Sequence, residues 1–341
     1  MYILGIETSC DETSVAIIEN NRVLVNLVSS QMFHKLYGGV VPELSSRAHL
    51  EQLFPLIRES LKTAGLQIED IDIIAATAGP GLIGALMVGY NSGKTIAHSL
   101  GKQFFPVNHI EGHMFSGFIG RENISYPVLN LTVSGGHTIL SVLNSPTSIN
   151  ILGSTLDDAA GEAFDKVAKL TGMGYPGGPA IQNYASKGNE GKISFPVASL
   201  KSKYDFSFSG LKTAVLRYIQ ANYKNGELPG EDEKSDIALA FQNSAINSLI
   251  NPVKFALKNH KFRSLSLNGG VAANKKLRES FKNIAEKNSL ELLIPDFEYC
   301  GDNAAMIAIR AKLLNDSGVK INYLKYEPFP SFRSEFLENN M

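Results

Sequence analysis

One pattern occurs twice in this chain: an apolar run, a short turn of small polar residues, and a second apolar run. The first copy spans residues 2–18 and the second spans residues 127–143. Turns of this kind offer backbone N–H groups and hydroxyls without side-chain bulk, which is how proteins commonly bind phosphate. Two facing copies, one in each lobe, would hold a nucleotide between them, whereas two unrelated hairpins would show the same local pattern.

A third glycine-rich turn favours the paired interpretation. Asn268-Gly269-Gly270 follows the apolar run 264–267 and precedes a helix that we expect to begin near Asn274. The N-terminus of a helix attracts anions because the helix dipole is positive there, and glycines let a flat base or a ribose approach the backbone. The three turns together indicate a nucleotide-binding protein.

The composition is ordinary for a globular protein. The 341 residues are enough for two domains with sizeable cores, and 44% are hydrophobic while 19% are charged. The formal net charge is −1, so no global basic field attracts nucleic acid. Binding to nucleic acid would have to use local patches or a partner.

The cysteines and the apolar runs favour a cytoplasmic protein with no membrane segment. Cys10 and Cys300 are the only cysteines and suggest no disulfide framework. Acidic residues such as Glu7 interrupt the N-terminal apolar run, which has no basic segment before it and is not expected to be a signal peptide. The uncharged run 73–90 has the length of a membrane span, but Gly79-Pro80-Gly81 divides it into a strand and a helix. We interpret it as buried core.

Hydrophobic periodicity and turn residues predict the order of strands and helices. Leu50, Leu53, Phe54, Ile57 and Leu61 follow the helical period and predict the apolar face of a helix over 42–64, ended by Gly65. Strands are expected at 2–6, 15–18, 23–28, 71–75, 104–107, 127–133, 139–143, 264–267 and 290–294. Further helices are expected after the 79–81 turn to about 100, at 155–170 behind a capping box at 155–158, at 209–223, at 235–258, from 274, and at 302–314. Glycines at 84, 89 and 93 predict that something packs very close to the second helix.

Two histidines are candidate metal ligands. His109 and His113 are four residues apart, which places them on one face of a helical turn with Cβ atoms about 5–6 Å apart. That suits two ligands of one metal ion, although histidines that cap or form hydrogen bonds would show the same spacing. A zinc protease needs Glu directly after the first His. Ile110 stands there and Glu111 comes one position later, so a protease is disfavoured and Glu111 is expected to be a helix-face residue.

Nine longer motifs, in order along the chain, resemble one known family. They are GIETSCDET at 5–13, GGVVPE at 38–43, AGPGL at 78–82, HIEGH at 109–113, VSGGHT at 133–138, DDAAGEAFDK at 157–166, YPGGP at 175–179, FSFSGLKT at 206–213 and GGVAAN at 269–274. Together they resemble the bacterial tRNA adenosine threonylcarbamoyltransferases, a family once classed as glycoproteases. The resemblance covers nearly the whole chain up to about Leu314.

The resemblance implies an α/β fold of the two-lobed actin/Hsp70/sugar-kinase-like (ASKHA) type, with a nucleotide and metal cleft between the lobes. The expected lobes are residues 1–108, completed by the C-terminal region 303–335, and residues 109–302. The implied reaction transfers threonylcarbamoyl from threonylcarbamoyl-AMP to the N6 amine of the adenosine adjacent to the anticodon, in tRNAs that read codons beginning with A, and releases AMP. The implied partners are tRNA, a paralogous subunit of the same fold and a small ATPase.

Carried over position by position, the resemblance also implies the site residues. The metal ligands would be His109, His113 and Asp302, the last in the sequence CGDNAAM at 300–306, where Gly301 replaces a more usual threonine. The ligand-binding positions would be Thr132, Val133, Ser134, Gly135, Gly136, Asp165, Gly178 and Asn274. The family often has an acidic residue where Gln182 stands, so a contact there is left open. Two histidines and one carboxylate suit Fe²⁺, with Zn²⁺ as the alternative, beside an adenine nucleotide as substrate.

The first polar turn contains the candidate catalytic groups. Asp11 and Glu12 would position a water molecule or a cation at the phosphate, whereas carboxylates that cap the turn are the alternative. Cys10 lies in the same turn without a histidine near it in sequence, which favours a small buried thiol over a nucleophile. Basic residues of the second half of the chain could contact tRNA phosphates, whereas a solvated surface charge is the alternative for each one. They are Lys201, Lys203, Lys212, Arg217, Lys275, Lys276 and Arg278.

Other function classes explain less of the sequence. An ATP-hydrolysing kinase or chaperone-like member of the same fold class is the alternative that explains the phosphate turns, but it leaves the histidine pair unexplained. A metalloprotease explains the pair but not the turns. An inactive scaffold would need neither.

Overall fold

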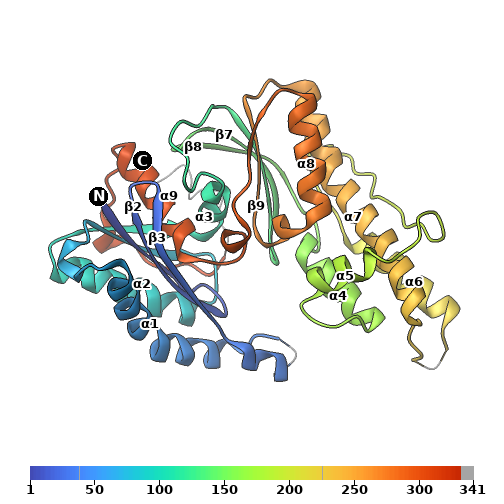
Figure 1. Cartoon of the computed structure of the whole chain (residues 1–341), viewed down its shortest axis with the longest axis horizontal. Coiled ribbons are helices and arrows are strands. Elements are labelled where there is room, and N and C mark those ends of the chain that lie inside the picture. Colours follow the sequence, from blue (N-terminus) through green and yellow to red (C-terminus); the bar gives the residue numbers. More distant parts are fainter. Residues whose placement is uncertain (38, 225, 332–341) are drawn as a thin grey trace. The chain divides into compact units, whose positions relative to one another are not determined.

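The computed structural model describes residues 1–37, 39–224 and 226–331, and it divides into two compact units. Unit 1 comprises Met1–Ile124, Ser145–Ser148 and the C-terminal segment from Pro295, and unit 2 comprises Ser125–Asn144 and Ile149–Ile294. Each unit contains one five-stranded sheet (Figure 1). Gly38 of an expected motif and residues 332–335 of the expected first lobe lie outside the described residues.

The sheet of unit 1 has the order β3-β2-β1-β4-β5. The strands are β1 (Tyr2–Glu7), β2 (Glu12–Glu19), β3 (Arg22–Ser30), β4 (Ile73–Gly79) and β5 (Gln103–Asn108). β1, β2 and β3 pair antiparallel, whereas β4 pairs parallel with both β1 and β5. Parallel strands end at the same edge of a sheet. The residues that follow β1, β4 and β5 are therefore neighbours in space.

Helices cover both faces of this sheet. Because side chains alternate along a strand, Leu4 and Ile6 pack with Leu53 of α1 (Pro42–Ala64) and Tyr90 of α2 (Ile83–Ser99). Ile3 points the other way and packs with α9 (Ala304–Asp316). The short helix α3 (His109–Ser116) packs on α9 and β5.

The helix predicted over 42–64 has the expected bounds and ends at Gly65, which adopts the left-handed conformation with φ of 70°. Its predicted apolar face is only partly buried. Leu53 and Ile57 lie in the core, but Leu50 and Phe54 are 62% and 54% exposed, so the prediction was wrong for those two side chains. The helical period identifies a face, and the width of the neighbouring elements decides how much of it is covered.

The close packing expected at the glycines of the second helix is confirmed. A Cβ placed on Gly89 would lie 2.4 Å from the hydroxyl oxygen of Thr8, which itself donates a hydrogen bond to the Ala85 carbonyl. The run 73–90 divides into β4 and the start of α2, as predicted. Within the described ranges, none of the helices combines the length and the apolar character needed to cross a membrane.

The sheet of unit 2 has the order β10-β9-β6-β7-β8. Its strands are β6 (Val128–Val133), β7 (Thr138–Ser145), β8 (Ser148–Ser154), β9 (Ser264–Asn268) and β10 (Glu291–Leu293). Its helices are α4 (Ala160–Thr171), α5 (Gly177–Ala185), α6 (Ser209–Asn222), α7 (Glu231–Asn259) and α8 (Lys275–Lys287). β6 pairs parallel with β9, so the two strands end at the same edge. The periodicity did not predict β8 or α5.

Two predicted helix starts, at 155 and at 235, differ from the structure, in which α4 begins at Ala160 and α7 at Glu231. The segment 155–158 is not a capping box, because α4 begins at Ala160 and Thr155 instead forms a bridge with Phe206. Asp157 accepts hydrogen bonds from the N–H groups of Phe208 and Ser209, so it caps α6. Short 3-10 helices, which the periodicity did not predict, lie at Met32–Tyr37, Ile68–Asp70, Gly270–Ala273, Phe297–Tyr299 and Tyr323–Lys325.

The limits of the expected lobes differ from those of the compact units. α3 and the connection before α9 were expected in the second lobe, but both belong to unit 1. The reason is packing: α3 lies directly on α9 and on the sheet of unit 1.

Candidate functional site

α3 begins where β5 ends, at the edge of the unit 1 sheet. Asn108 caps the helix, because its Oδ1 accepts hydrogen bonds from the N–H groups of Ile110 (2.8 Å) and Glu111 (3.2 Å). An N-cap of this kind satisfies two of the unpaired donors at a helix start. The cap fixes the first turn, so that His109 and His113 project from one side of the helix.

Asp302 reaches the same place from the C-terminal part of the chain. It precedes α9, whose N-cap is Asn303 rather than Asp302, since the Asn303 side chain accepts from the N–H of Met306 at 3.0 Å. The first N–H group of α9, on Ala304, donates to the hydroxyl of Ser14 at 2.9 Å. The start of α9 is therefore tied to the β1–β2 hairpin.

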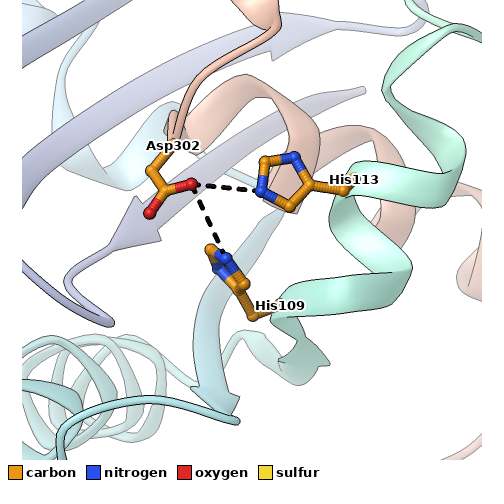
Figure 2. Close-up of side chains that lie close together, drawn as sticks. All are labelled: His109, His113 and Asp302. Atoms are coloured by element: carbon orange, nitrogen blue, oxygen red, sulfur yellow. Dashed lines mark hydrogen bonds and ion pairs between the residues drawn. The ribbon is translucent and has the colours of Figure 1, made fainter. Parts of the chain in front are cut away.

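The three side chains converge on one point (Figure 2). Oδ1 of Asp302 lies 3.1 Å from Nε2 of His113 and 3.6 Å from Nε2 of His109. One ligand atom from each residue lies within 4.8 Å of the others. Both histidines are buried and Asp302 is partly exposed. The convergence that the family resemblance implied is thus present in the fold.

A buried carboxylate orients the first histidine. Glu7, at the end of β1, places Oε2 3.0 Å from Nδ1 of His109. The same carboxylate accepts hydrogen bonds from the N–H of Ser9 at 2.5 Å and from the hydroxyl of Thr77 at 2.6 Å. A carboxylate on the far nitrogen of a histidine fixes the ring orientation and strengthens the near nitrogen as a ligand. Glu7 therefore directs Nε2 of His109 toward Asp302.

Several carboxylates act on the groups at this point. Burial disfavours the charged form of His109, but Asp302 and Glu7 outweigh it and raise its pKa to about 9. For Glu12, burial together with Asp302 and Asp11 raises the pKa to about 9. Carboxylates crowded around two imidazoles are an environment that attracts a cation.

These residues fit a metal ion. Two imidazole nitrogens and one carboxylate oxygen converge, and the opposite nitrogen of His109 is already held by Glu7. Sets of two histidines and one carboxylate with open positions are typical of non-haem Fe²⁺ centres, and Zn²⁺ accepts the same ligands. Nδ1 of His113 is buried and has no hydrogen-bond partner among the described residues, so Nε2 is the nitrogen of that ring directed at Asp302.

Glu111 is not the helix-face residue that its sequence position suggested. It is buried, and its Oε2 lies 2.7 Å from Nε of Arg310 on α9 and 2.5 Å from Nη2. Arg310 also donates to the Pro146 carbonyl at 2.6 Å and stacks on Phe115, 4.4 Å from the ring centroid. The pair joins the helix that carries both histidines to the helix that follows Asp302.

The polar turn between β1 and β2 contains Cys10 and Asp11, and Glu12 is the first residue of β2. All three side chains are half-buried. Burial, reinforced by Asp11, raises the pKa of the Cys10 thiol, which makes it a poor nucleophile. A buried histidine holds this turn: His49 contacts the Cys10 carbonyl at 3.0 Å and the Thr13 hydroxyl at 2.7 Å.

In unit 2, the second polar turn lies against the start of α4. The turn is closed by a hydrogen bond from the N–H of Ser134 to the His137 carbonyl at 2.8 Å. A Cβ on Gly161 would lie 2.7 Å from the Ser134 carbonyl oxygen, so the helix approaches the turn as closely as glycine allows. Gly135 and Gly136 are exposed, whereas the three residues before them are buried, including Thr132. Of the expected positions Thr132–Gly136, the two glycines are therefore the exposed ones, and a ligand would meet the segment there.

The third turn fits against the second. Gly269 has a φ of 87°, and a Cβ there would lie 2.5 Å from the Val133 carbonyl oxygen. Asn274 caps α8 by accepting from the N–H of Leu277 at 3.0 Å, and its amide donates to Gln242 at 2.8 Å. The end of β9 and the start of α8 are thereby fixed beside the Ser134–Gly136 turn.

The remaining expected ligand contacts lie on neighbouring helices of unit 2. Asp165 accepts from the N–H of Gly177 at 2.7 Å and so caps α5, whose second residue is Gly178. Burial raises the pKa of Asp165. Gln182 accepts from the N–H of Lys275 at 2.7 Å and supports the start of α8. The amide oxygen of Gln182 is thus engaged in a hydrogen bond within unit 2.

Among the basic residues expected to contact tRNA, some are engaged within unit 2. Lys212 forms an ion pair with Asp158, and Lys276 donates to Asn243. Arg278 donates to the Ala272 carbonyl at 2.6 Å. The others, Lys201, Lys203, Arg217 and Lys275, are exposed.

The structure therefore groups the expected site residues by unit. The metal set and the catalytic candidates belong to unit 1, and all the expected nucleotide-binding positions belong to unit 2. Sequence reasoning missed Glu7, Arg310 and His49. The available signal was a charged residue inside or directly after an apolar run, at Glu7 and at Arg310, because such residues are rarely buried without a partner.

Solved structures with similar folds define the class. The chain superposes on the HypF protein of T. kodakarensis with a TM-score of 0.59 at 14% identity, over 97% of this chain and 49% of that one. It superposes on the (R)-2-hydroxyglutaryl-CoA dehydratase component A of Acidaminococcus fermentans with a TM-score of 0.53 at 16% identity. That superposition covers 92% of this chain and 99% of the other. The fold is of the actin/Hsp70/sugar-kinase-like class.

Sequence comparison gives the family. The family model described as TsaD: tRNA N6-adenosine threonylcarbamoyltransferase matches residues 22–309. A tRNA N6-adenosine threonylcarbamoyltransferase of Thermosipho africanus is 46% identical over 94% of this chain and 96% of its own length. The tRNA N6-adenosine threonylcarbamoyltransferase of Caldicellulosiruptor bescii is 44% identical over 95% of this chain and 96% of its own length. The chain belongs to this family, and it is a tRNA-modifying transferase.

Proposed function

We propose that the protein transfers the threonylcarbamoyl group of threonylcarbamoyl-AMP to the N6 amine of the adenosine adjacent to the anticodon, in tRNAs that read codons beginning with A. The observation that carries the proposal is the convergence of His109, His113 and Asp302 in a chain of this family. In the reaction the amine nitrogen forms a bond to the carbamoyl carbon, the bond from that carbon to the phosphate oxygen breaks, AMP leaves, and the amine loses a proton.

The metal ion would be Fe²⁺, with Zn²⁺ as the alternative, held by His109, His113 and Asp302. When bound, such an ion polarises a carbonyl and orients the group to be transferred. Glu7 would keep the ring of His109 aligned through Nδ1. Asp11 and Glu12, in the adjoining turn, would position a water molecule or a cation near the phosphate.

Unit 2 would bind the adenylate. The exposed Gly135 and Gly136 leave the backbone of the turn open to a phosphate. We assign the phosphate to the turn Thr132–Gly136 and the adenosine to the region of Asp165, Gly178 and Asn274. The side chains of Asp165 and Asn274 cap helices, so they would shape the site more than they would contact the ligand.

The remaining parts of the proposal come from the resemblance alone. They are a cytoplasmic location, a paralogous subunit of the same fold, and a small ATPase that assists the transfer.

The test is to incubate the protein with threonylcarbamoyl-AMP and unmodified tRNA, with and without those two partners, and to measure threonylcarbamoyl-adenosine. Metal content of the purified protein is measured in parallel. Asp302→Ala should lose most of the product and much of the metal while remaining folded. His98→Ala, at an exposed histidine of α2, is the matched control and should change neither. A fully active Asp302→Ala enzyme with wild-type metal content would refute the proposal.

A further inference from the structure

Unit 2 contains a cavity that lies apart from the expected site residues. Lys203 is the one expected site residue in its lining. The cavity lies between the irregular segment 197–207 and the C-terminal half of α7, and its volume is about 450 Å³. Its lining includes Ser199, Lys203 and Phe206 of that segment and Ser248, Asn251 and Phe255 of α7. Small-molecule sites in proteins begin at about 300 Å³. The cavity is therefore large enough for one nucleotide-sized group.

One wall of the cavity is fixed and aromatic. Phe206 is fully buried. Its N–H donates to the Ser154 carbonyl at 3.1 Å, and its carbonyl accepts from the N–H of Leu156 at 2.9 Å. On α7, the ring of Phe255 meets Tyr204 edge to face, with 5.2 Å between centroids and 67° between planes. Phe255 remains 37% exposed. That ring can accept a planar group by stacking.

The lining also offers hydrogen-bonding groups. In a helix, the N–H of residue 252 would donate to the carbonyl of Ser248, four residues earlier. Pro252 has no N–H, so the Ser248 carbonyl lacks this helical hydrogen bond. The Ser248 hydroxyl donates to the Ser244 carbonyl at 2.9 Å, so it offers a ligand an acceptor, while Asn251 and Ser199 add an amide and a hydroxyl. An aromatic ring beside several small donors and acceptors suits the face and the edge of a nucleobase.

The surroundings are basic. The segments 197–207 and 248–261 contain five exposed lysines, Lys201, Lys203, Lys254, Lys258 and Lys261, against one acidic residue, Asp205. Within the described part of the chain, none of these lysines forms an ion pair with a carboxylate. Unit 2 has nineteen Lys and Arg and fourteen Asp and Glu, a net charge of +5, whereas the whole chain has −1. Lys203 donates to the Leu200 carbonyl at 3.2 Å. Lysines without a carboxylate partner around a cavity favour a polyanion.

We propose that this cavity binds an unpaired nucleotide of the tRNA, distinct from the adenosine that is modified. The base would stack on Phe255, its edge would meet Ser248 and Asn251, and its phosphates would meet Lys203 and neighbouring lysines. RNA-binding proteins recognise unpaired bases by this combination of stacking, edge contacts and cations. The inference rests on the proposed function, because it takes tRNA to be the substrate.

The experiment measures binding of an unmodified tRNA transcript to the full chain at several salt concentrations. Phe255→Ala should weaken binding about tenfold, since stacking of one base contributes about 1–3 kcal/mol. Lys203→Ala should reduce the slope of log affinity against log salt by about one. Two matched controls lie on α1, Phe54→Ala and Lys62→Ala, and both of those side chains are exposed. Neither control should change binding.

Turnover separates this inference from the proposed function. If both hold, Phe255→Ala raises the KM for tRNA about tenfold and leaves kcat unchanged. If wild-type enzyme forms product and Phe255→Ala has wild-type KM and affinity, the cavity does not bind tRNA and the inference is wrong. If Phe255→Ala keeps its tRNA affinity but loses binding of a protein partner, the cavity is a protein-binding site and the inference is equally wrong. If wild-type enzyme binds tRNA through the cavity but forms no product, only the proposed function fails.

Discussion

Replacing Glu111 by Gln should destabilise unit 1 strongly. Glu111 and Arg310 are 6% and 3% exposed, and Oε2 of Glu111 lies 2.7 Å from Nε of Arg310 and 2.5 Å from Nη2. Glutamine keeps the shape and one acceptor oxygen but removes the charge, so the buried Arg310 would keep only neutral partners, among them the Pro146 carbonyl and the ring of Phe115. Removing one partner of a buried ion pair costs about 3–5 kcal/mol, because the other charge remains desolvated.

The assay is thermal and urea unfolding of metal-free protein, since a bound ion would itself add stability. At about 2–4 °C per kcal/mol for a unit of this size, the melting temperature should fall by roughly 6–20 °C. The matched control is Glu43→Gln on α1. Glu43 pairs with Arg47 at 2.7 Å, but those side chains are 76% and 68% exposed, and such a pair contributes under about 1 kcal/mol.

Removing both charges provides a second check. Glu111→Met combined with Arg310→Met should be less destabilising than Glu111→Gln, because no unpaired charge is left in the interior. Equal unfolding midpoints for Glu111→Gln and Glu43→Gln would refute the reasoning. The affinity for metal should also fall in Glu111→Gln, since the pair joins α3 to α9 beside His113 and Asp302.

Three further outcomes are expected. Glu7→Gln should lower metal affinity about 10–100-fold by weakening the hold on His109, measured by metal titration, and unchanged affinity would contradict the role of Glu7. Gly135→Val should abolish adenylate binding, measured by calorimetry, while metal content is retained, because no atom lies within 4 Å of the added Cβ and the fold can accept it. Burial disfavours the charge on Asp158, but hydrogen bonds from Lys166 and Lys212 outweigh it and lower its pKa. The hydrogen bonds to the charged Asp158 therefore stabilise the folded protein above the ordinary carboxyl pKa of about 3.9. This stabilisation is lost as the pH falls through the lowered pKa of Asp158. Asp158→Asn should therefore unfold more easily than the wild type at pH 7 but not in strong acid, and a difference that persists in acid would count against this assignment.

Features that depend on a few consecutive residues could be predicted from the sequence. The bounds of α1, the stop at Gly65, the division of 73–90 into strand and helix, and the two polar turns all follow from local periodicity and turn chemistry. Local reasoning failed where a side chain had a distant partner. Asp157 resembled part of a cap for the helix after it, yet it caps α6, about fifty residues further along.

The sequence by itself determined that His109 and His113 share one helical face, because four residues make about one turn. The identity of the third ligand came from the family resemblance, and only the tertiary structure could bring it to the pair. Asp302 lies 189 positions from His113, Glu7 lies 102 from His109, and Arg310 lies 199 from Glu111. The parallel pairing of β1, β4 and β5 ends all three strands at one edge, and α9 packs back onto the same sheet. A local pattern could mark Glu7 and Arg310 as charged residues that need a buried partner. It could not give the partner, since the chemistry at a point depends on which distant segments the sheet and its helices bring there.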